Sequence, residues 1–350
     1  MTISEAKKLL ISEKHYVLFR LPNEKTAHLV AANHIHAYDT IPSDWSQLRN
    51  SFVFAPFSTG KEQFLAIPSE KSHLIEIAGK SMKALEYLPT ESTPTSVYRQ
   101  AFKAFSSAIR SRRFQKLVLS RSCDIAIPTQ DPIDLFEKAA LAYPNAMVYL
   151  FHSPQTGHWL GVSPELLIAG DDIQLRTIAL AGTLRNNGGT IPIENWGEKE
   201  RLEQRIVADY IRDRIAGFGT WKDEWGPYSI NAGHLSHLRT DFYFQVEEEQ
   251  RADFISAIHP TPAVCGLPKE ESIAFIQQHE GYDRGYYAGF LGMVEDSSRM
   301  ELYVNLRCMR FDEKSATLYA GGGILSTSDL TSEWMETEEK MNTLKRILFQ

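Results

Sequence analysis

The stretch from Leu318 to Lys340 constrains the fold more than any other part of the chain. It opens with an alternating apolar run typical of a strand, which meets three consecutive glycines, Gly321, Gly322 and Gly323. Because glycine tolerates positive φ and lets a ligand approach the bare backbone, we expect a turn here that lines a cavity. The Ser/Thr/Asp cluster at 326–329 then supplies N-cap residues for a charged helix.

Two acidic pairs point to a metal. Glu333 and Glu336 lie three residues apart in this helix and therefore share one face. Glu200 and Glu203 open a second predicted helix, 198–215, whose buried face is predicted to consist of Leu202, Ile206, Val207, Tyr210 and Ile211. Carboxylates in a first turn also gain from the helix dipole, which is the simpler explanation of the second pair. Two pairs that both face inward favour a shared cation, and oxygen ligands without supporting histidine or cysteine indicate Mg²⁺ rather than zinc.

Composition excludes several classes of protein. The 350 residues are 43% hydrophobic and 23% charged, which is ordinary for a globular chain, and the net charge of −7 argues against a nucleic-acid binder. Three cysteines without a CxxC pair fit a reducing compartment. We find no signal-peptide pattern and no apolar run of about 20 residues that could span a membrane, so we expect a cytoplasmic protein.

The chain divides into an N-terminal supporting segment and a catalytic region. Residues 1–95 alternate short apolar runs with polar turns and carry no constellation that implies chemistry, so we expect a supporting segment of the same domain. The polar segment ESTPTS at 91–96 is predicted to be a connection. The catalytic region is expected to span 96–350.

Two side chains in this region are candidates for acid–base chemistry. Lys116 begins a predicted strand, 116–127; it is either a lysine that extends to solvent at a strand end or one held in a pocket as a base. Glu165 interrupts an apolar segment, where burial favours the protonated form that suits a general acid. The alternative is a glutamate at a strand turn.

Arg307 lies within an apolar segment, 300–311, that is predicted to be one strand of a hairpin closing over FDEKS. A buried arginine needs an anion. A substrate carboxylate would supply a bidentate partner, and a salt bridge to one of the glutamates is the alternative.

These motifs together resemble the chorismate-utilising enzymes, the family of isochorismate, salicylate, anthranilate and aminodeoxychorismate synthases. The resemblance runs from about residue 97 to the C-terminus and rests on ten segments in order: KLVLSR (116–121), SPELL (163–167), LAGT (180–183), KExxE (199–203), HLxT (237–240), HPTPAVCGLPK (259–269), RGYYAGFLG (284–292), NLRC (305–308), AGGGI (320–324) and SEWMETEEK (332–340). One departure is Gln204, where the family often has histidine after KExxE.

The resemblance implies an α+β fold with large, mainly antiparallel sheets in the core and helices outside. It implies that Glu203 and Glu336 hold Mg²⁺, with Glu200 and Glu333 close by, and that the metal binds the ring carboxylate of chorismate. The substrate-binding set that it implies is Arg307, Tyr287, His237, Ala263, Thr183, Gly321, Gly322 and Gly323.

The resemblance also indicates the reaction. Members that use ammonia lack a lysine at the position of Lys116 and draw on a glutamine amidotransferase, so no such subunit is expected here. Lys116 would activate water and Glu165 would protonate the departing hydroxyl, which gives isochorismate for menaquinone or siderophore synthesis. Ala263 stands where enzymes that go on to eliminate pyruvate have threonine, which favours an isochorismate synthase. The alternatives are a salicylate synthase and a non-catalytic chorismate-binding subunit.

Overall fold

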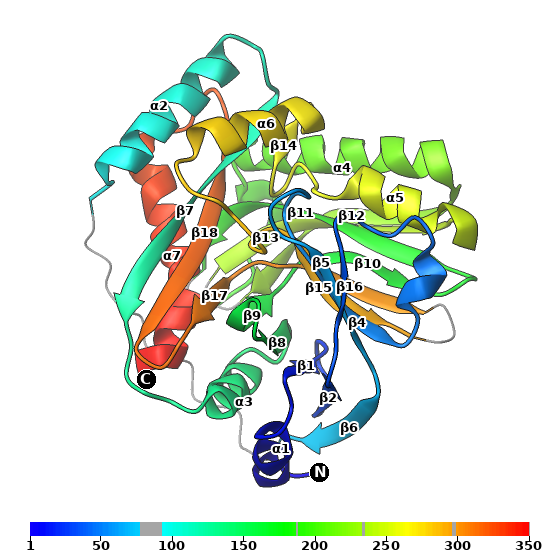
Figure 1. The fold of residues 1–350 in the computed structure, drawn as a ribbon. Coiled ribbons are helices and arrows are strands. Elements are labelled where there is room, and N and C mark those ends of the chain that lie inside the picture. Colours follow the sequence, from blue (N-terminus) through cyan, green and yellow to red (C-terminus); the bar gives the residue numbers. More distant parts are fainter. Residues whose placement is uncertain (78–92, 187, 233–234, 296–298, 350) are drawn as a thin grey trace.

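The computed structural model of the protein describes residues 1–77, 93–186, 188–232, 235–295 and 299–349 (Figure 1). Within these residues the strands form two nine-stranded sheets, and the pairs between named strands are antiparallel. The α+β class with large antiparallel sheets is therefore confirmed.

The first sheet carries the three glycines. Its order is β14-β7-β18-β17-β9-β8-β1-β2-β6. The strands are β1 (His15–Arg20), β2 (Thr26–Ala32), β6 (Lys71–Glu76), β7 (Lys116–Ala126), β8 (Met147–Ser153), β9 (Gly157–Ser163), β14 (Gly266–Leu267), β17 (Cys308–Phe311) and β18 (Ser315–Ile324).

The second sheet has the order β12-β13-β11-β10-β16-β15-β4-β5-β3. Its strands are β3 (His36–Tyr38), β4 (Ser51–Ala55), β5 (Phe64–Pro68), β10 (Leu166–Gly170), β11 (Leu175–Arg185), β12 (Thr220–Ala232), β13 (Leu235–Gln245), β15 (Phe290–Val294) and β16 (Met300–Val304). Residues 1–77 contribute β1, β2 and β6 to the first sheet and β3, β4 and β5 to the second. The predicted connection at 91–96 begins outside the described residues.

Helices surround the sheets, as Figure 1 shows. They are α1 (Ile3–Leu10), α2 (Ser96–Arg110), α3 (Pro132–Ala142), α4 (Glu198–Phe218), α5 (Arg251–Ile258), α6 (Lys269–His279) and α7 (Leu330–Phe349). Helix α3 begins at an Asp-Pro cap, because the Asp131 side chain accepts the N–H groups of Ile133 and Asp134 and proline occupies the first turn.

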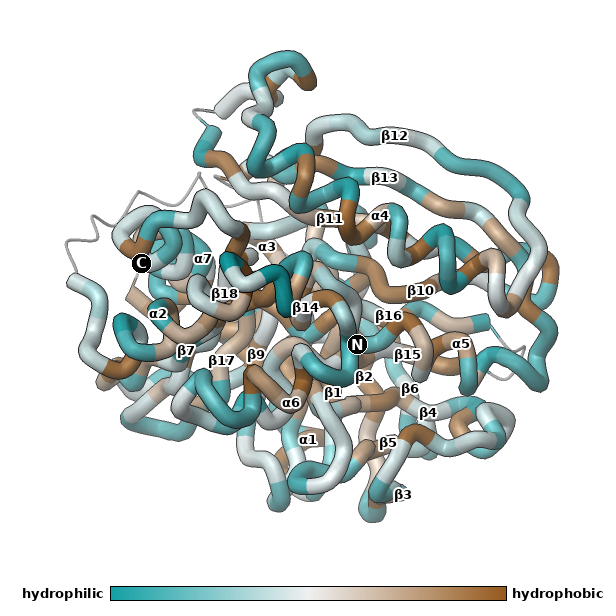
Figure 2. The backbone as a smooth tube through the Cα atoms, turned by 90° about the horizontal axis from the view of Figure 1, so that it is seen from above, coloured by the Kyte–Doolittle hydropathy of each residue, from teal (hydrophilic) through white to brown (hydrophobic). Residues whose placement is uncertain are grey.

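Successive side chains along the strands of the first sheet point to opposite faces, and each face belongs to a different hydrophobic core. In β1, Val17 belongs to the larger core, which the two sheets share, whereas its neighbour Leu18 belongs to a second core under α1, α3 and α7. In the larger core, the Phe54 ring of β4 lies 4.4 Å from the Phe151 ring of β8, centroid to centroid. Figure 2 shows the result, with hydrophobic residues in the central strands and a largely hydrophilic edge strand β12.

Three local predictions are wrong. Residues 300–311 do not form one strand, because β16 and β17 belong to different sheets and Arg307 lies between them at φ 47°. The three glycines lie inside β18, opposite Ser120–Val118 of β7, rather than in a turn. Leu202 is 45% exposed, and the buried face of α4 includes Gln204 instead, whose amide donates to Thr240 Oγ1 at 2.7 Å.

Candidate active site

A pocket opens where the two sheets meet α4 and α7. It contains ≈ 630 Å³ of space unfilled by atoms, part of it open to solvent. The lining includes ten of the predicted site residues: Glu165, Thr183, Glu203, His237, Ala263, Tyr287, Arg307, Gly321, Gly322 and Gly323. They come from segments far apart in the sequence, so only the fold brings them together.

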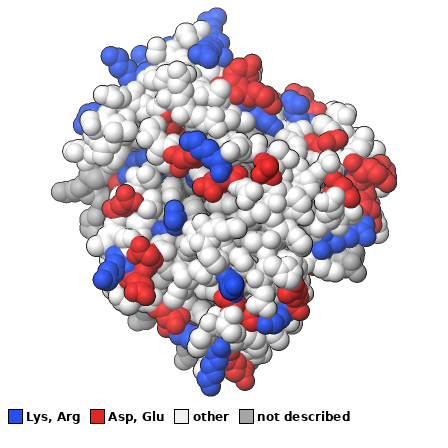
Figure 3. Space-filling model, viewed as in Figure 1, with Lys and Arg blue, Asp and Glu red and all other residues white. Residues whose placement is uncertain are grey.

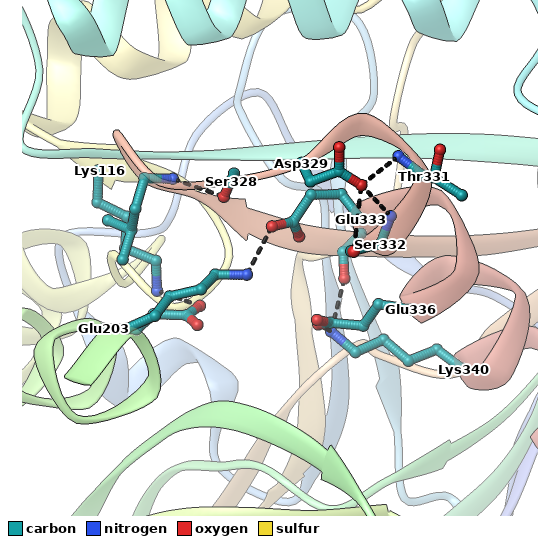
Figure 4. A network of polar contacts seen from close by, with 12 residues as sticks. Lys116, Glu203, Ser328, Asp329, Thr331, Ser332, Glu333, Glu336 and Lys340 are labelled. Carbon is teal, nitrogen blue, oxygen red and sulfur yellow. Dashed lines mark hydrogen bonds and ion pairs between the residues drawn. The ribbon is translucent and has the colours of Figure 1, made fainter. Parts of the chain in front are cut away.

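Lys116 begins β7 and is fully buried. Its Nζ lies 3.0 Å from Oε1 of Glu203 on α4, a contact that is an ion pair but lacks the direction of a hydrogen bond (Figure 4). Extension of the side chain to solvent is therefore excluded. The lysine is held inside the protein with its carboxylate partner beside the pocket.

The glycines of β18 make room for these side chains. A Cβ atom at Gly323 would lie 2.1 Å from Glu203 Oε1 and 2.8 Å from Lys116 Cε. A Cβ atom at Gly322 would lie 3.2 Å from an oxygen of Glu333 and 3.4 Å from one of Glu336. The glycines are thus needed for close approach and not for positive φ, since their φ values lie outside the left-handed region.

The two glutamates of α7 are also paired with lysines. Lys199 Nζ lies 2.6 Å from Glu333 Oε1, and Lys340 Nζ lies 2.8 Å from Glu336 Oε1. Burial and the nearby Glu336 raise the pKa of Glu333 to about 7. Burial also opposes ionisation of Glu336, but the Lys340 ammonium holds the pKa of that carboxyl below its usual value.

The first turn of α4 places Lys199 beside this cluster. Burial tends to lower the pKa of its ammonium, but the three carboxylates of Glu333, Glu336 and Glu203 raise it above the ordinary value. Glu200 takes no part in these pairs: among the described residues its carboxylate has no ion-pair partner, and one oxygen lies back over Gly197. The four predicted acidic residues are therefore not equivalent.

Glu165 lies between β9 and β10 and is only 4% exposed. Burial raises the pKa of its carboxyl to about 8, although the positive charges of Lys116, Lys340 and Arg307 oppose the rise. A carboxyl with this pKa is mostly protonated at neutral pH, which is the form that a general acid needs.

Arg307 binds His237 rather than a glutamate. Its Nη2 lies 2.7 Å from His237 Nε2, and its Nη1 donates to the carbonyl oxygen of Ala232 at 3.2 Å. His237 Nδ1 lies 3.0 Å from the carbonyl oxygen of Gly182 and must carry the proton, so Nε2 accepts from the arginine. Burial lowers the pKa of Arg307 to about 10. In the described part of the chain no carboxylate forms an ion pair with this guanidinium, so the predicted alternative of a salt bridge to a glutamate is wrong.

Two further features escaped the sequence prediction. Tyr319 lines the pocket, and its ring stacks on that of Tyr287 with the ring centroids 5.5 Å apart.

The second feature is a fully buried ion pair, Glu280 with Arg284, at 2.7 Å. Arg284 donates to the carbonyl oxygen of Val118, and Glu280 accepts the N–H of Ser120. This pair replaces a strand partner along the outer edge of β7. The positive residue in RGYY and the acidic residue four positions before it were the available signal.

The carboxylate oxygens of these side chains are the type of ligand that Mg²⁺ prefers. Three carboxylates from α4 and α7 converge on Gly322 and Gly323, and Oε2 of Glu333 is buried without a hydrogen bond. Such hard oxygen donors suit Mg²⁺. In the described part of the chain no three His, Cys, Asp or Glu side chains are close enough to share an ion, and Glu203, Glu333 and Glu336 each face a lysine.

Comparison with known proteins defines the class. The family profile described as "Chorismate binding enzyme" matches residues 41–349, and the chain belongs to this family. Isochorismate synthase EntC of Escherichia coli (strain K12) is 29% identical over 282 residues, which cover 76% of this chain and 70% of EntC. Isochorismate synthase MenF of the same strain is 30% identical over 260 residues, 72% of this chain and 60% of MenF. The crystal structure of DhbC from Bacillus anthracis superposes with a TM-score of 0.79 at 25% identity, covering 98% of this chain and 99% of DhbC.

The distribution of charge on the surface and the hydropathy of the helices complete the description. The face in Figure 3 carries acidic and basic side chains interspersed, in keeping with the net charge of −7. Among the described helices none is both long and apolar enough to cross a membrane.

Proposed function

We propose that this protein is an isochorismate synthase, an isomerase that converts chorismate to isochorismate. The observation that carries the proposal is the presence of two buried groups at one pocket of a chorismate-binding enzyme. Glu165 lines the pocket, and its pKa is raised to about 8; Lys116 is fully buried and contacts Glu203, which also lines the pocket. The relatives named isochorismate synthase support the same reaction.

The reaction exchanges one hydroxyl for another. Lys116, acting as the base, takes a proton from water while the water oxygen forms a bond to the ring carbon next to the carboxylate-bearing one. The ring double bonds shift, the bond to the allylic hydroxyl breaks, and Glu165 gives its proton to the departing oxygen. One water enters and one leaves, so the product is an isomer of the substrate.

Binding of the substrate falls to the residues around this pair. The Arg307 guanidinium and the Gly321–Gly323 backbone would hold a carboxylate and the enolpyruvyl arm, and Tyr287 would help to orient them. His237 fixes the orientation of Arg307, because its Nε2 accepts from the guanidinium and its Nδ1 is tied to the backbone.

A bound Mg²⁺ would neutralise the ring carboxylate of chorismate and draw electron density towards it. Glu203 and Glu336 would hold the ion, with Glu333 and Glu200 close by. The oxygen-only donor set at Gly322 and Gly323 supports this assignment. The three free cysteines support a cytoplasmic location.

The test is incubation of the protein with chorismate and Mg²⁺, followed by chromatography of the products and a coupled assay for pyruvate. We expect isochorismate without pyruvate, and we expect Lys116→Ala and Glu165→Gln to abolish it while Glu313→Gln, an exposed carboxyl, does not. Stoichiometric pyruvate with salicylate would make the protein a salicylate synthase and refute the reading of Ala263. Metal binding without any product would favour a non-catalytic chorismate-binding subunit.

A further inference from the structure

Every carboxylate proposed to face the metal, apart from Glu200, is already neutralised by a lysine. The Nζ–Oε1 distances are 3.0 Å for Lys116 and Glu203, 2.6 Å for Lys199 and Glu333, and 2.8 Å for Lys340 and Glu336. The cluster therefore contains three lysine–glutamate contacts, one for each of these carboxylates. The ammonium groups beside these Oε1 atoms repel a divalent ion that approaches the same carboxylates, so displacement of one ammonium favours binding of the ion.

The three lysines differ in how firmly they are held. Lys116 is completely buried in β7. Lys340 has a second bond, from its ammonium to the carbonyl oxygen of Gly321 at 2.7 Å. Lys199 lies in the first turn of α4 with its side chain 27% exposed, and in the described part of the chain its ammonium makes one bond, to Glu333. Its neighbours Gly197 and Glu198 are exposed, so solvent is within reach of its flexible stem.

Glu333 needs a counter-ion whenever it is ionised. It is 1% exposed, and its second oxygen is buried without a hydrogen bond among the described residues. An ionised carboxylate in this position is costly unless a positive charge accompanies it. Lys199 can supply that charge without the metal, and a divalent ion can supply it when bound.

We propose that Lys199 is a built-in competitor of the metal, which neutralises Glu333 in the metal-free protein and swings to solvent when Mg²⁺ binds. This inference rests on the proposed function, because the metal site is part of it. The lysine keeps the acidic cluster stable without an ion, and in exchange it weakens the binding of Mg²⁺. A ligand that binds the folded state in competition with an internal group gains affinity when that group is removed.

The experiment is calorimetric titration of Mg²⁺ into the substrate-free protein and its variants. Lys199→Met should bind Mg²⁺ about tenfold more tightly than the unmodified protein, which corresponds to about 1.4 kcal/mol. Its melting temperature without metal should fall, and the rise produced by saturating Mg²⁺ should be larger. Lys222→Met, which removes the same charge from an exposed position on β12, should leave both quantities unchanged.

A second variant keeps the test decisive if Lys199→Met does not fold. Lys199→Arg retains the charge and can bind Glu333 with two hydrogen bonds, so it should weaken Mg²⁺ binding several-fold. Unchanged Mg²⁺ affinity in the folded variants would overturn the competition while leaving the metal site intact. No binding by any form of the protein would overturn the metal site and the competition together.

Discussion

Replacement of Glu165 by glutamine should remove activity and at the same time stabilise the protein. Folding raises the pKa of this carboxyl from 4.5 to about 8, mainly because it is buried. The folded state therefore binds more protons than the unfolded state between these two values, and stability falls as the pH rises through that window. Glutamine keeps the shape of the side chain and does not titrate.

The magnitude follows from the two pKa values. The raised pKa of this carboxyl costs the folded state about 1 kcal/mol at pH 5, about 3 kcal/mol at pH 7 and about 5 kcal/mol at pH 9. Glu165→Gln should recover this free energy, since the side chain lines the pocket and its amide can be hydrated there. At pH 7 the gain corresponds to a rise in melting temperature of roughly 4 °C for a chain of this size.

The assay is a series of thermal unfolding curves from pH 5 to pH 9 for the unmodified protein, Glu165→Gln and Glu313→Gln. The difference between Glu165→Gln and the unmodified protein should grow with pH and level off above about pH 8, whereas the exposed control should show no such trend. The activity of the unmodified protein should decline above about pH 8 as the acid loses its proton. A difference that does not depend on pH, or a glutamine variant that retains activity, would refute the reasoning.

Other changes test the rest of the site. Gly323→Ala should lower kcat/KM by at least about 100-fold, because its Cβ would displace Glu203, while the protein should still fold. The control is Gly189→Ala, where a Cβ would enter open space, and it should leave kcat/KM unchanged in the same steady-state assay. Arg307→Lys should raise KM for chorismate about tenfold or more and change kcat less, since a bidentate partner of the substrate is lost; an unchanged KM would remove this arginine from the binding site. Glu280→Gln should reduce the free energy of unfolding in urea by about 3–5 kcal/mol, because it leaves a buried guanidinium without its counter-ion, and a loss below 1 kcal/mol would contradict the role given to this pair.

Much of the local structure could be predicted from the sequence. Strand β7 and helix α4 begin at the predicted residues, Lys116 and Glu198, because periodicity is a local property. Glu165 could be recognised as a candidate acid because a carboxyl among apolar residues has few explanations. The break before Arg307 was missed, since strands that pass from one sheet to another keep the same alternating pattern.

The sequence by itself determined which chemical groups are available: one lysine and one carboxyl in apolar surroundings, two acidic pairs on helices and a run of glycines. The tertiary structure decided how these groups are paired. Position 323 in β18 is occupied by glycine because Lys116 and Glu203 fill the volume that a side chain would need. These side chains meet there only once β7, β18 and α4 are packed together. Partners that lie more than a hundred residues apart, such as Lys199 and Glu333, leave no periodic signal, so their ion pairs follow from packing and charge in the folded protein alone.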